Sequence, residues 1–415
     1  MASIRPFAGY YANPEAAEWF VSPPYDALTP QERFAYANAN PANFLNAMRS
    51  LEEYPPAERP DIDDLLRANR TRLRRMIDAR DLLPMHKPAL FLYRMAQPGH
   101  QQIGVVAEVP VSEYEHGLIK KHENTQQDKE NDLVSYMRVV GASTSPICLA
   151  YPAQPAIDAL VSRLVEREPL VDFVAPDDVA QTVWHIDDEQ QIAQLAQLFA
   201  GVPAAYLTDG HHRAAAAVHV AAERRREHPG GNGEEPYEYL LTAFFPDDQL
   251  RILEYNRCVT GRNGLTVEEL LAEISKGFTV QRLAVTDPEQ ARPESPGQVA
   301  MFLDGNWYRL TARTVPRRSD DPVAALDVTL LQKRIFETAL GIDDPRSDPR
   351  LRYMPAAFKL ADLERMCRER DEIAFALHPT SIADLIAVAD AGATMPPKSA
   401  WFDPKMRSGL FVRLR

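Results

Sequence analysis

The sequence predicts an α+β fold in which mixed sheets carry antiparallel hairpins and flanking helices. Three observations support this prediction. Short β-rich runs are joined by tight turns, amphipathic helical segments lie between them, and hairpin patterns outnumber strand–helix–strand units. In addition, 34 prolines among the 415 residues divide the chain into short elements, because proline is disfavoured inside helices and strands.

The N-terminal part contains two predicted helices and a predicted hairpin. Thr29-Pro30-Gln31-Glu32 is a capping box with proline at the first helical position, so a helix begins there. Residues 61–80 show helical periodicity, with five arginines placed mostly away from the apolar face. The β-rich runs 89–95 and 103–111 are joined by a Pro-Gly turn and predict a hairpin.

The rest of the chain alternates between helices and strands. Helices are predicted at residues 156–167, 188–199, 213–226, 265–276, 326–340 and 381–391. Strands are predicted at residues 181–186, 239–245, 251–257, 373–377 and 410–414, with a hairpin of 299–303 and 307–310 around Asp304-Gly305-Asn306. From length we expect an N-terminal portion (1–150), a core (151–260) and a C-terminal portion (261–415), folded as one compact functional unit.

Composition restricts the class of protein. The net charge of −13 opposes broad binding to nucleic acid. The three cysteines lie far apart, without metal or redox spacing, which suits a reducing cytoplasm. The N-terminus shows no apolar targeting segment, and no window approaches 18 apolar residues. We therefore expect a cytoplasmic protein without a membrane span, and homo-oligomerisation stays open.

The most informative segment is residues 205–213, which reads AYLTDGHHR. The hydrophobic residues predict the end of a buried strand, and Asp209 and Gly210 predict a turn before a helix. Backbone N–H groups and the positive end of the helix dipole favour anions at such a place. Arg213 can bind two phosphate oxygens, and His211 or His212 can donate to a third.

Two other interpretations of this segment are structural capping and metal binding. Asp209 could simply cap the helix. Adjacent helical residues point about 100° apart, so His211 and His212 cannot easily share one metal ion. The Cys and His spacings of a zinc site are absent. We therefore assign no metal site from the sequence.

Residues 117–132 form a second dense group of charges, GLIKKHENTQQDKEND, directly after a strand-like region. Glu123 could accept a proton or hold Mg²⁺. Lys120 or Lys121 could neutralise phosphate charge. The alternative is an ordinary solvated face, which is how charge runs are usually placed.

Two proline-stiffened segments complete the candidates. Ser22-Pro23-Pro24 presents Tyr25 and Asp26 as a pocket wall, or forms only a rigid turn. Near the C-terminus, Met395-Pro396-Pro397 exposes Lys398, and Lys405 follows seven residues later. These lysines form either an anion clamp or part of a solvated connection.

Asp-Gly-His-His-Arg resembles the phosphate-binding signature of the ParB/sulfiredoxin superfamily, which includes nucleotide-dependent kinases of free serine. His211 stands where sulfiredoxins carry cysteine, so sulfinic acid reduction would lack its nucleophile. Nearly the whole chain also resembles the bacterial and archaeal family known as domain of unknown function 1015. The segments that carry this resemblance are Ile4–Phe7, Ser22–Asp26, Lys120–Thr125, Asp209–Arg213, Met395–Ser399 and Pro404–Lys405.

The resemblance implies a ParB/sulfiredoxin-like nucleotide-binding core and a phosphotransferase that uses ATP or ADP with Mg²⁺. Its leading acceptor is free L-serine, which would give O-phosphoserine. The expected catalytic residues are Glu123, His212 and Lys121. The expected phosphate-binding residues are Asp209, Gly210, His211, His212, Arg213, Lys398 and Lys405, and the expected substrate contacts are Tyr25, Asp26, His122 and Thr125.

Two alternatives remain open at the level of sequence. The first is a ParB-like nucleotide-binding regulator or DNA-associated protein, which the arginine-rich helix at 61–80 favours and the net charge opposes. The second is a phosphate-ester hydrolase that uses the same pocket with water as acceptor. No Walker-type loop, GxGxxG or protein-kinase signature occurs in the chain.

Overall fold

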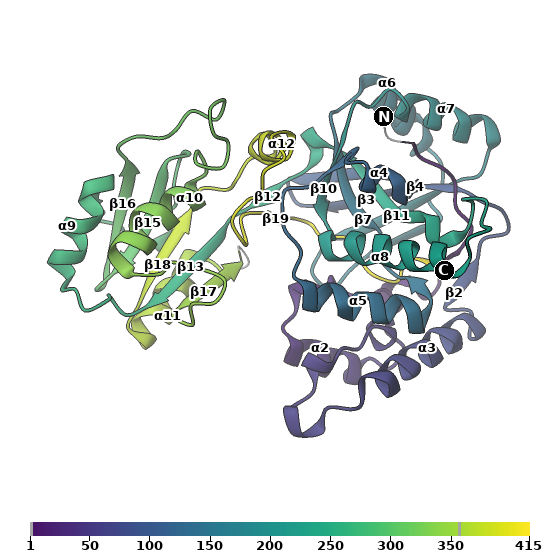
Figure 1. Cartoon of the computed structure of the whole chain (residues 1–415), viewed down its shortest axis with the longest axis horizontal. Helices are drawn as coiled ribbons and strands as arrows, with labels where there is room; N and C mark the ends of the chain where they lie inside the picture. The colour runs from purple at the N-terminus through teal and green to yellow at the C-terminus, as the bar shows by residue number, and fades with distance from the viewer. Residues whose placement is uncertain (1–2, 356–357) are drawn as a thin grey trace. The chain divides into compact units, whose positions relative to one another are not determined.

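The computed structural model describes residues 3–355 and 358–415, apart from the side chain of Asp26. The chain forms two units. Unit 1 contains Met1–Leu250 and Pro404–Arg415, and unit 2 contains Arg251–Asp403. Figure 1 shows mixed α and β structure in both units. One sheet of unit 1 includes strands from both the 1–150 and the 151–260 portions expected from the sequence.

Unit 1 is built on an eight-stranded mixed sheet with the order β5-β10-β7-β11-β4-β3-β9-β8. Its strands are β3 (Leu90–Gln97), β4 (His100–Pro110), β5 (Ile119–Lys120), β7 (Ile147–Tyr151), β8 (Val171–Val174), β9 (Ala180–Ile186), β10 (Ala205–Asp209) and β11 (Tyr239–Pro246). The β3–β4 hairpin confirms its prediction, with Gln97 opposite His100 at the turn. Most neighbours are antiparallel, whereas β5–β10 and β7–β11 are parallel.

Helices pack against this sheet and against one another. Figure 1 shows α3 (Ile62–Asp78), α5 (Gln127–Val140) and α8 (His211–Glu227) together, and α5 contacts both of the others. The contacting helices α6 (Pro155–Leu164) and α7 (Glu189–Phe199) lie elsewhere on the unit. The small buried side chains of α8, including Ala214, Ala217 and Ala221, join the core of the sheet.

Unit 1 also contains helices from the first 115 residues of the chain. Helix α2 (Pro30–Ala39) has the predicted capping box between Thr29 and Glu32. The shorter helices are α1 (Ala17–Phe20) and α4 (Val111–Glu115).

The end of the chain returns to unit 1 through a second sheet with the order β2-β1-β20-β6. Its strands are β1 (Tyr10–Ala12), β2 (Leu82–Pro84), β6 (Ala142–Ser143) and β20 (Phe411–Leu414). Buried Phe411 packs on Phe7 and Phe91 of the same unit. The C-terminal segment that carries Lys405 therefore belongs to the unit that holds residues 205–213.

Unit 2 has an antiparallel six-stranded sheet with the order β14-β16-β15-β18-β13-β17. Its strands are β13 (Tyr255–Thr260), β14 (Phe278–Arg282), β15 (Gln298–Leu303), β16 (Asn306–Ala312), β17 (Leu351–Pro355) and β18 (Glu372–Leu377), with β12 (Ile252–Leu253) and β19 (Trp401–Phe402) paired separately. Its helices are α9 (Val267–Gly277), α10 (Asp327–Leu331), the π-helix η8 (Gln332–Leu340), α11 (Leu360–Arg370) and α12 (Ile382–Asp390).

The predicted mixture of α and β structure is confirmed, whereas the ParB/sulfiredoxin-like core stays a prediction. The hairpin around Asp304 and Gly305 is present, and both residues have the positive φ that its two-residue turn requires. The helix expected at 326–340 is instead α10 followed by a π-helix. Within residues 3–355 and 358–415, no helix has both the length and the apolar character needed to cross a membrane.

Candidate functional site

The turn between β10 and α8 has the strand-to-helix form that the sequence predicts. Tyr206 and Leu207 are buried in β10, and α8 begins at His211, two residues earlier than expected. Gly210 has a φ of +95°, and a Cβ atom there would lie 3.0–3.1 Å from the Arg213 guanidinium. Glycine is favoured by the left-handed conformation, and a larger residue would also displace the Arg213 guanidinium slightly.

The N-cap residue of α8 is Gly210, so Asp209 does not occupy the capping position. Its carboxylate forms ion pairs with Arg213, at 2.7 Å, and with Lys405, at 3.4 Å. We call these three residues the ion cluster. Burial alone would raise the pKa of Asp209, but the charges of Lys405 and Arg213 outweigh it and hold the pKa at about 2.

Arg213 is bonded to two other segments of the protein. Its Nη1 donates to the backbone carbonyls of Ser145, at 3.1 Å, and Pro146, at 2.6 Å, while Nη2 donates to Asp209. Three of its five N–H groups are thus bonded within the protein. In this arrangement Arg213 joins the first turn of α8 to the loop before β7, and phosphate binding by Arg213 stays a prediction.

Strand pairing brings the second charged segment to the same turn. β5 runs parallel to β10, with Ile119 opposite Ala205 and Lys120 opposite Tyr206. Parallel neighbours end at the same edge of a sheet, so the residues after Lys120 arrive beside the start of α8. The backbone N–H of Gln126 donates to Nε2 of His212 at 3.0 Å, which fixes this segment against the helix.

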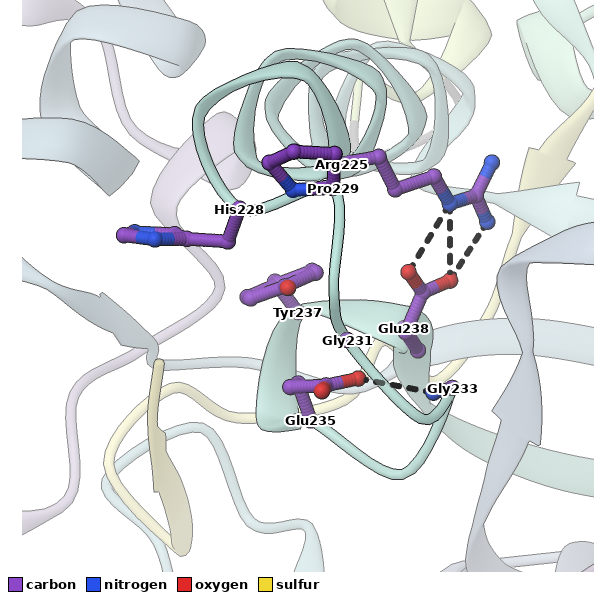
Figure 2. Close-up of a pocket in the computed structure, with 8 residues that line it drawn as sticks. All are labelled: Arg225, His228, Pro229, Gly231, Gly233, Glu235, Tyr237 and Glu238. Atoms are coloured by element: carbon purple, nitrogen blue, oxygen red, sulfur yellow. Dashed lines mark hydrogen bonds and ion pairs between the residues drawn. The ribbon is translucent and has the colours of Figure 1, made fainter.

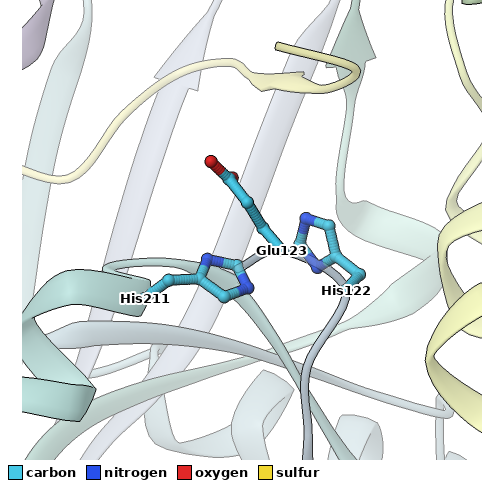
Figure 3. Close-up of side chains that lie close together, drawn as sticks. All are labelled: His122, Glu123 and His211. Atoms are coloured by element: carbon cyan, nitrogen blue, oxygen red, sulfur yellow. The ribbon is translucent and has the colours of Figure 1, made fainter. Parts of the chain in front are cut away.

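Three side chains meet at this edge, as Figure 3 shows: His122, Glu123 and His211. We call them the histidine cluster. One ligand atom from each lies within 4.8 Å of the other two. The imidazole rings of His122 and His211 are 4.5 Å apart at an angle of 86°, and both histidines are buried. Nδ1 of His122 and Nε2 of His211 are buried without a hydrogen-bond partner.

Both imidazoles of the histidine cluster are neutral at pH 7. Burial lowers the pKa of His122 to about 4, although a hydrogen bond to the Leu207 carbonyl and the charge of Asp209 oppose the shift. Burial, followed by the neighbouring His122, lowers the pKa of His211 well below its usual value. The two rings therefore offer nitrogen lone pairs or N–H donors rather than positive charge.

The other candidates of this segment, Lys120, Lys121 and Thr125, contact neighbouring side chains. The Nζ atom of Lys120 is 5.8 Å from the centre of the Tyr206 ring, and that of Lys121 is 4.7 Å from the centre of the Tyr114 ring. Thr125 donates to Glu130 at 3.3 Å, just before α5.

Two further candidates, Tyr25 and Lys398, contact other residues. Tyr25 is exposed, and the Arg33 guanidinium lies 4.7 Å from the centre of its ring. Lys398 belongs to unit 2, where its Nζ lies 5.4 Å from the centre of the Tyr255 ring. The side chain of Asp26 lies outside the described residues. Substrate or phosphate binding by these three stays a prediction.

A separate hollow of about 280 Å³ lies at the other end of α8 (Figure 2). Arg225 forms an ion pair with Glu238 on its wall. The Glu235 carboxylate accepts hydrogen bonds from the backbone of Asn232 and Gly233 and folds the loop back on itself. This hollow contains none of the candidate residues predicted from the sequence.

The sequence predicts His122 as a substrate contact, but it gives no sign that His122 lies against His211. The parallel register of β5 and β10 creates this pair across 89 positions of chain. Only a correct prediction that these two short strands are neighbours could have revealed it.

Comparison with known proteins assigns the chain to a family. Residues 4–329, more than half of the chain, match the family described as "Protein of unknown function (DUF1015)". The chain therefore belongs to this family, as its motifs indicated. Among the curated proteins no match is found.

Several solved structures show a distant likeness in fold. A conserved hypothetical protein from Pyrococcus furiosus has 12% identity and a TM-score of 0.36, covering 74% of this chain and 95% of that one. A free serine kinase in complex with AMP has 11% identity and a TM-score of 0.34, covering 72% and 86%. SbnI from Staphylococcus aureus, truncated at its C-terminus, has 13% identity and a TM-score of 0.37, covering 74% and 87%. Likeness at this level does not assign an activity.

Proposed function

We propose that this protein transfers a phosphoryl group from a nucleotide to a small hydroxylated acceptor, with free L-serine as the leading acceptor. The observation that carries the proposal is the position of Glu123. Its carboxylate lies within 4.8 Å of a ring nitrogen of His211, the first residue of α8, and the N-cap residue of this helix is Gly210, which has no side chain. A candidate base thus stands beside a place that favours anions.

Phosphoryl transfer needs a phosphate cradle, neutralisation of charge and a group that orients the attacking hydroxyl. The start of α8 supplies the cradle through its N–H groups and its dipole. Lys120 ends β5 at this edge, Lys121 follows it, and Lys405 reaches the turn through Asp209. These lysines would offset the charge of the nucleotide phosphates.

Glu123 would orient or deprotonate the acceptor hydroxyl, and His212 and Lys121 would assist at the phosphate. Arg213 would act as a positioning residue, since its bonds to Asp209, Ser145 and Pro146 fix the turn. Mg²⁺ prefers oxygen ligands. The carboxylate of Asp209 is held in the ion cluster, so Mg²⁺ would arrive on the phosphates of ATP or ADP, and Glu123 could offer it a carboxylate oxygen.

The direct test incubates the full chain with L-serine, Mg²⁺ and either ATP or ADP, and measures O-phosphoserine by mass spectrometry. We expect phosphoserine with one of the two nucleotides and none without serine. Release of inorganic phosphate at the same rate with and without serine would favour the hydrolase. Nucleotide binding without turnover, together with specific binding to duplex DNA, would favour the regulator instead.

A further inference from the structure

The two unpaired nitrogens of the histidine cluster are unusual for a folded protein. Nδ1 of His122 and Nε2 of His211 are both buried without a hydrogen-bond partner, and their side chains belong to residues only 4% and 5% exposed. A buried polar group without a partner costs about 1–3 kcal/mol. Most buried polar atoms are paired, so two such atoms side by side point to a ligand that pairs them.

The hydrogen bond of His122 orients its ring for metal binding. The Leu207 carbonyl accepts a hydrogen bond from this ring, and since Nδ1 has no partner, the donor is Nε2–H. This tautomer leaves the lone pair of Nδ1 directed into the cluster. Metal-binding histidines commonly donate their other N–H to a backbone carbonyl or a carboxylate in the same way.

The separations within the cluster suit a single ion. Three ligand atoms that each lie about 2.1 Å from one tetrahedral ion are about 3.4 Å apart. The ligand atoms of His122, Glu123 and His211 lie within 4.8 Å of one another. The distances between them must therefore shorten by at most about 1.4 Å for one ion to bind all three, which rotation of the Glu123 side chain can supply. In Figure 3 the Glu123 side chain begins beside the two rings, and its carboxylate lies above them in this view.

We propose that His122, Glu123 and His211 bind one divalent transition-metal ion, such as Zn²⁺ or Mn²⁺. Two imidazoles and one carboxylate suit these ions, whereas Mg²⁺ prefers oxygen ligands alone. Three protein ligands leave a coordination position open. If the proposed phosphoryl transfer also holds, the acceptor hydroxyl would bind the ion at this position, and the ion would lower the pKa of that hydroxyl. Glu123 would then contribute by holding the ion rather than by taking the proton itself. The metal site itself does not depend on that transfer.

The test uses the full chain, stripped with a chelator and free of nucleotide. Calorimetric titrations with Zn²⁺, Mn²⁺, Co²⁺ and Mg²⁺ measure affinity and stoichiometry, and Co²⁺ adds the visible absorption of its bound ion. We expect one equivalent of a transition metal and much weaker binding of Mg²⁺. His122→Gln, His211→Gln and Glu123→Gln should each weaken metal binding about tenfold or more, by analogy with the loss of supporting contacts around metal ligands.

Two control variants separate this site from other metal-binding groups. His219→Gln removes a histidine that is partly exposed on the same helix, and should leave the affinity unchanged. Cys367→Ser disrupts a second group of close ligand atoms, Cys258, Cys367 and Glu372, and should also leave the equivalent bound. Circular dichroism and the apo melting temperature check that each variant is folded. For a variant that unfolds, the partly exposed Glu123→Gln remains the decisive substitution.

The proposal is overturned by any of three results. These are no stoichiometric binding of any transition metal, unchanged affinity in folded histidine variants or in Glu123→Gln, or loss of the equivalent in Cys367→Ser. The outcome is separate from that of the phosphoserine assay. A protein that binds Zn²⁺ but makes no phosphoserine keeps the metal site and loses the proposed function.

Discussion

The ion cluster and the histidine cluster both include residues of the turn between β10 and α8, but they differ in whether their polar atoms have partners. In the ion cluster, Asp209 is paired with Arg213 and Lys405, so the charges are satisfied within the protein. In the histidine cluster, two buried ring nitrogens have no partner. One five-residue motif thus contains residues that build the turn and a residue with unused bonding capacity. Unpaired bonding capacity at this turn therefore lies at His211 and His122, whereas Arg213 is bonded within the protein.

The largest expected effect comes from the carboxylate of the histidine cluster. Glu123→Gln keeps the size of the side chain but removes its charge and its basicity. We expect turnover to fall by about 10²–10⁴-fold while nucleotide affinity stays nearly unchanged, because a general base acts in the chemical step. Rates of phosphoserine formation and calorimetric nucleotide titrations measure the two quantities.

Asp128→Asn is the matched control for this substitution. Asp128 is an exposed carboxylate in the first turn of α5, in the same charged segment. Its loss should change turnover less than twofold or so, as expected of a solvated surface charge. Equal losses in the two variants would mean that Glu123 contributes only general negative charge.

The next effect concerns the stability at acid pH of the protein after a chelator has removed any bound metal. The pKa of His122 is about 4 in the folded state, against about 6.5 for an ordinary histidine, because burial disfavours the charged ring. Between these pH values the unfolded chain binds the additional proton. The free energy of unfolding should therefore have its full value above pH 6.5. It should fall by about 3 kcal/mol, from His122 alone, as the pH drops towards 4.

Urea unfolding at a series of pH values between 7 and 4 measures this loss. His122→Gln is neutral throughout, so its curve should be flatter than that of the wild type, whatever its absolute stability. A slope that is identical in the two proteins would show that the buried imidazole does not titrate in this window.

The third effect tests the ion cluster as a support. Arg213→Ala removes the bonds to Asp209, Ser145 and Pro146 and should loosen the start of α8. We expect nucleotide affinity and kcat/KM to fall together by about 10–100-fold, since hydrogen bonds of a charged group contribute about 1.5–3 kcal/mol. Arg213→Lys should not restore them, because lysine lacks the planar fork. Normal affinity in Arg213→Ala would remove the cradle from the mechanism.

The sequence predicts the local elements of the fold well because their causes are local. The capping box at Thr29, the hairpin turn at Asp304-Gly305 and the strand-to-helix turn at Gly210 each depend on a few adjacent residues. The elements that carry Lys120 and Glu123 were harder to place. β5 has only two residues, too few for a periodic pattern, and helix α5 begins inside the charged run at Gln127.

The partners of the site residues could not be predicted, because they depend on contacts between distant segments. Arg213 bonds to residues 145 and 146, and Asp209 to Lys405, 196 positions away. The contact of His211 with His122 was not predicted from the sequence, and phosphate binding by His211 stays a prediction. Residue types indicated a polar site at this turn, but only the fold determines which charged side chains form ion pairs with one another.

The smallest effect should appear at low pH in the ion cluster. Lys405 and Arg213 outweigh the burial that would raise the pKa of Asp209, and hold it at about 2 instead of the usual 3.8. A lowered carboxyl pKa stabilises the fold at pH values above 3.8, and this contribution is lost as the pH falls towards 2. We expect it to be about 1 kcal/mol, since Asp209 is partly exposed and solvent screens its charge.

Lys405→Met removes one of the two cations and should raise the pKa of Asp209, so that the loss of stability begins at a higher pH. NMR titration of the Asp209 carboxyl carbon measures the pKa directly. Lys87→Met is the control, because Lys87 and Asp187 form an exposed pair at 3.2 Å, and such pairs contribute little. An unchanged pKa of Asp209 in Lys405→Met would show that Arg213 alone holds the carboxylate ionised, and the C-terminal segment would then have no electrostatic part in the turn.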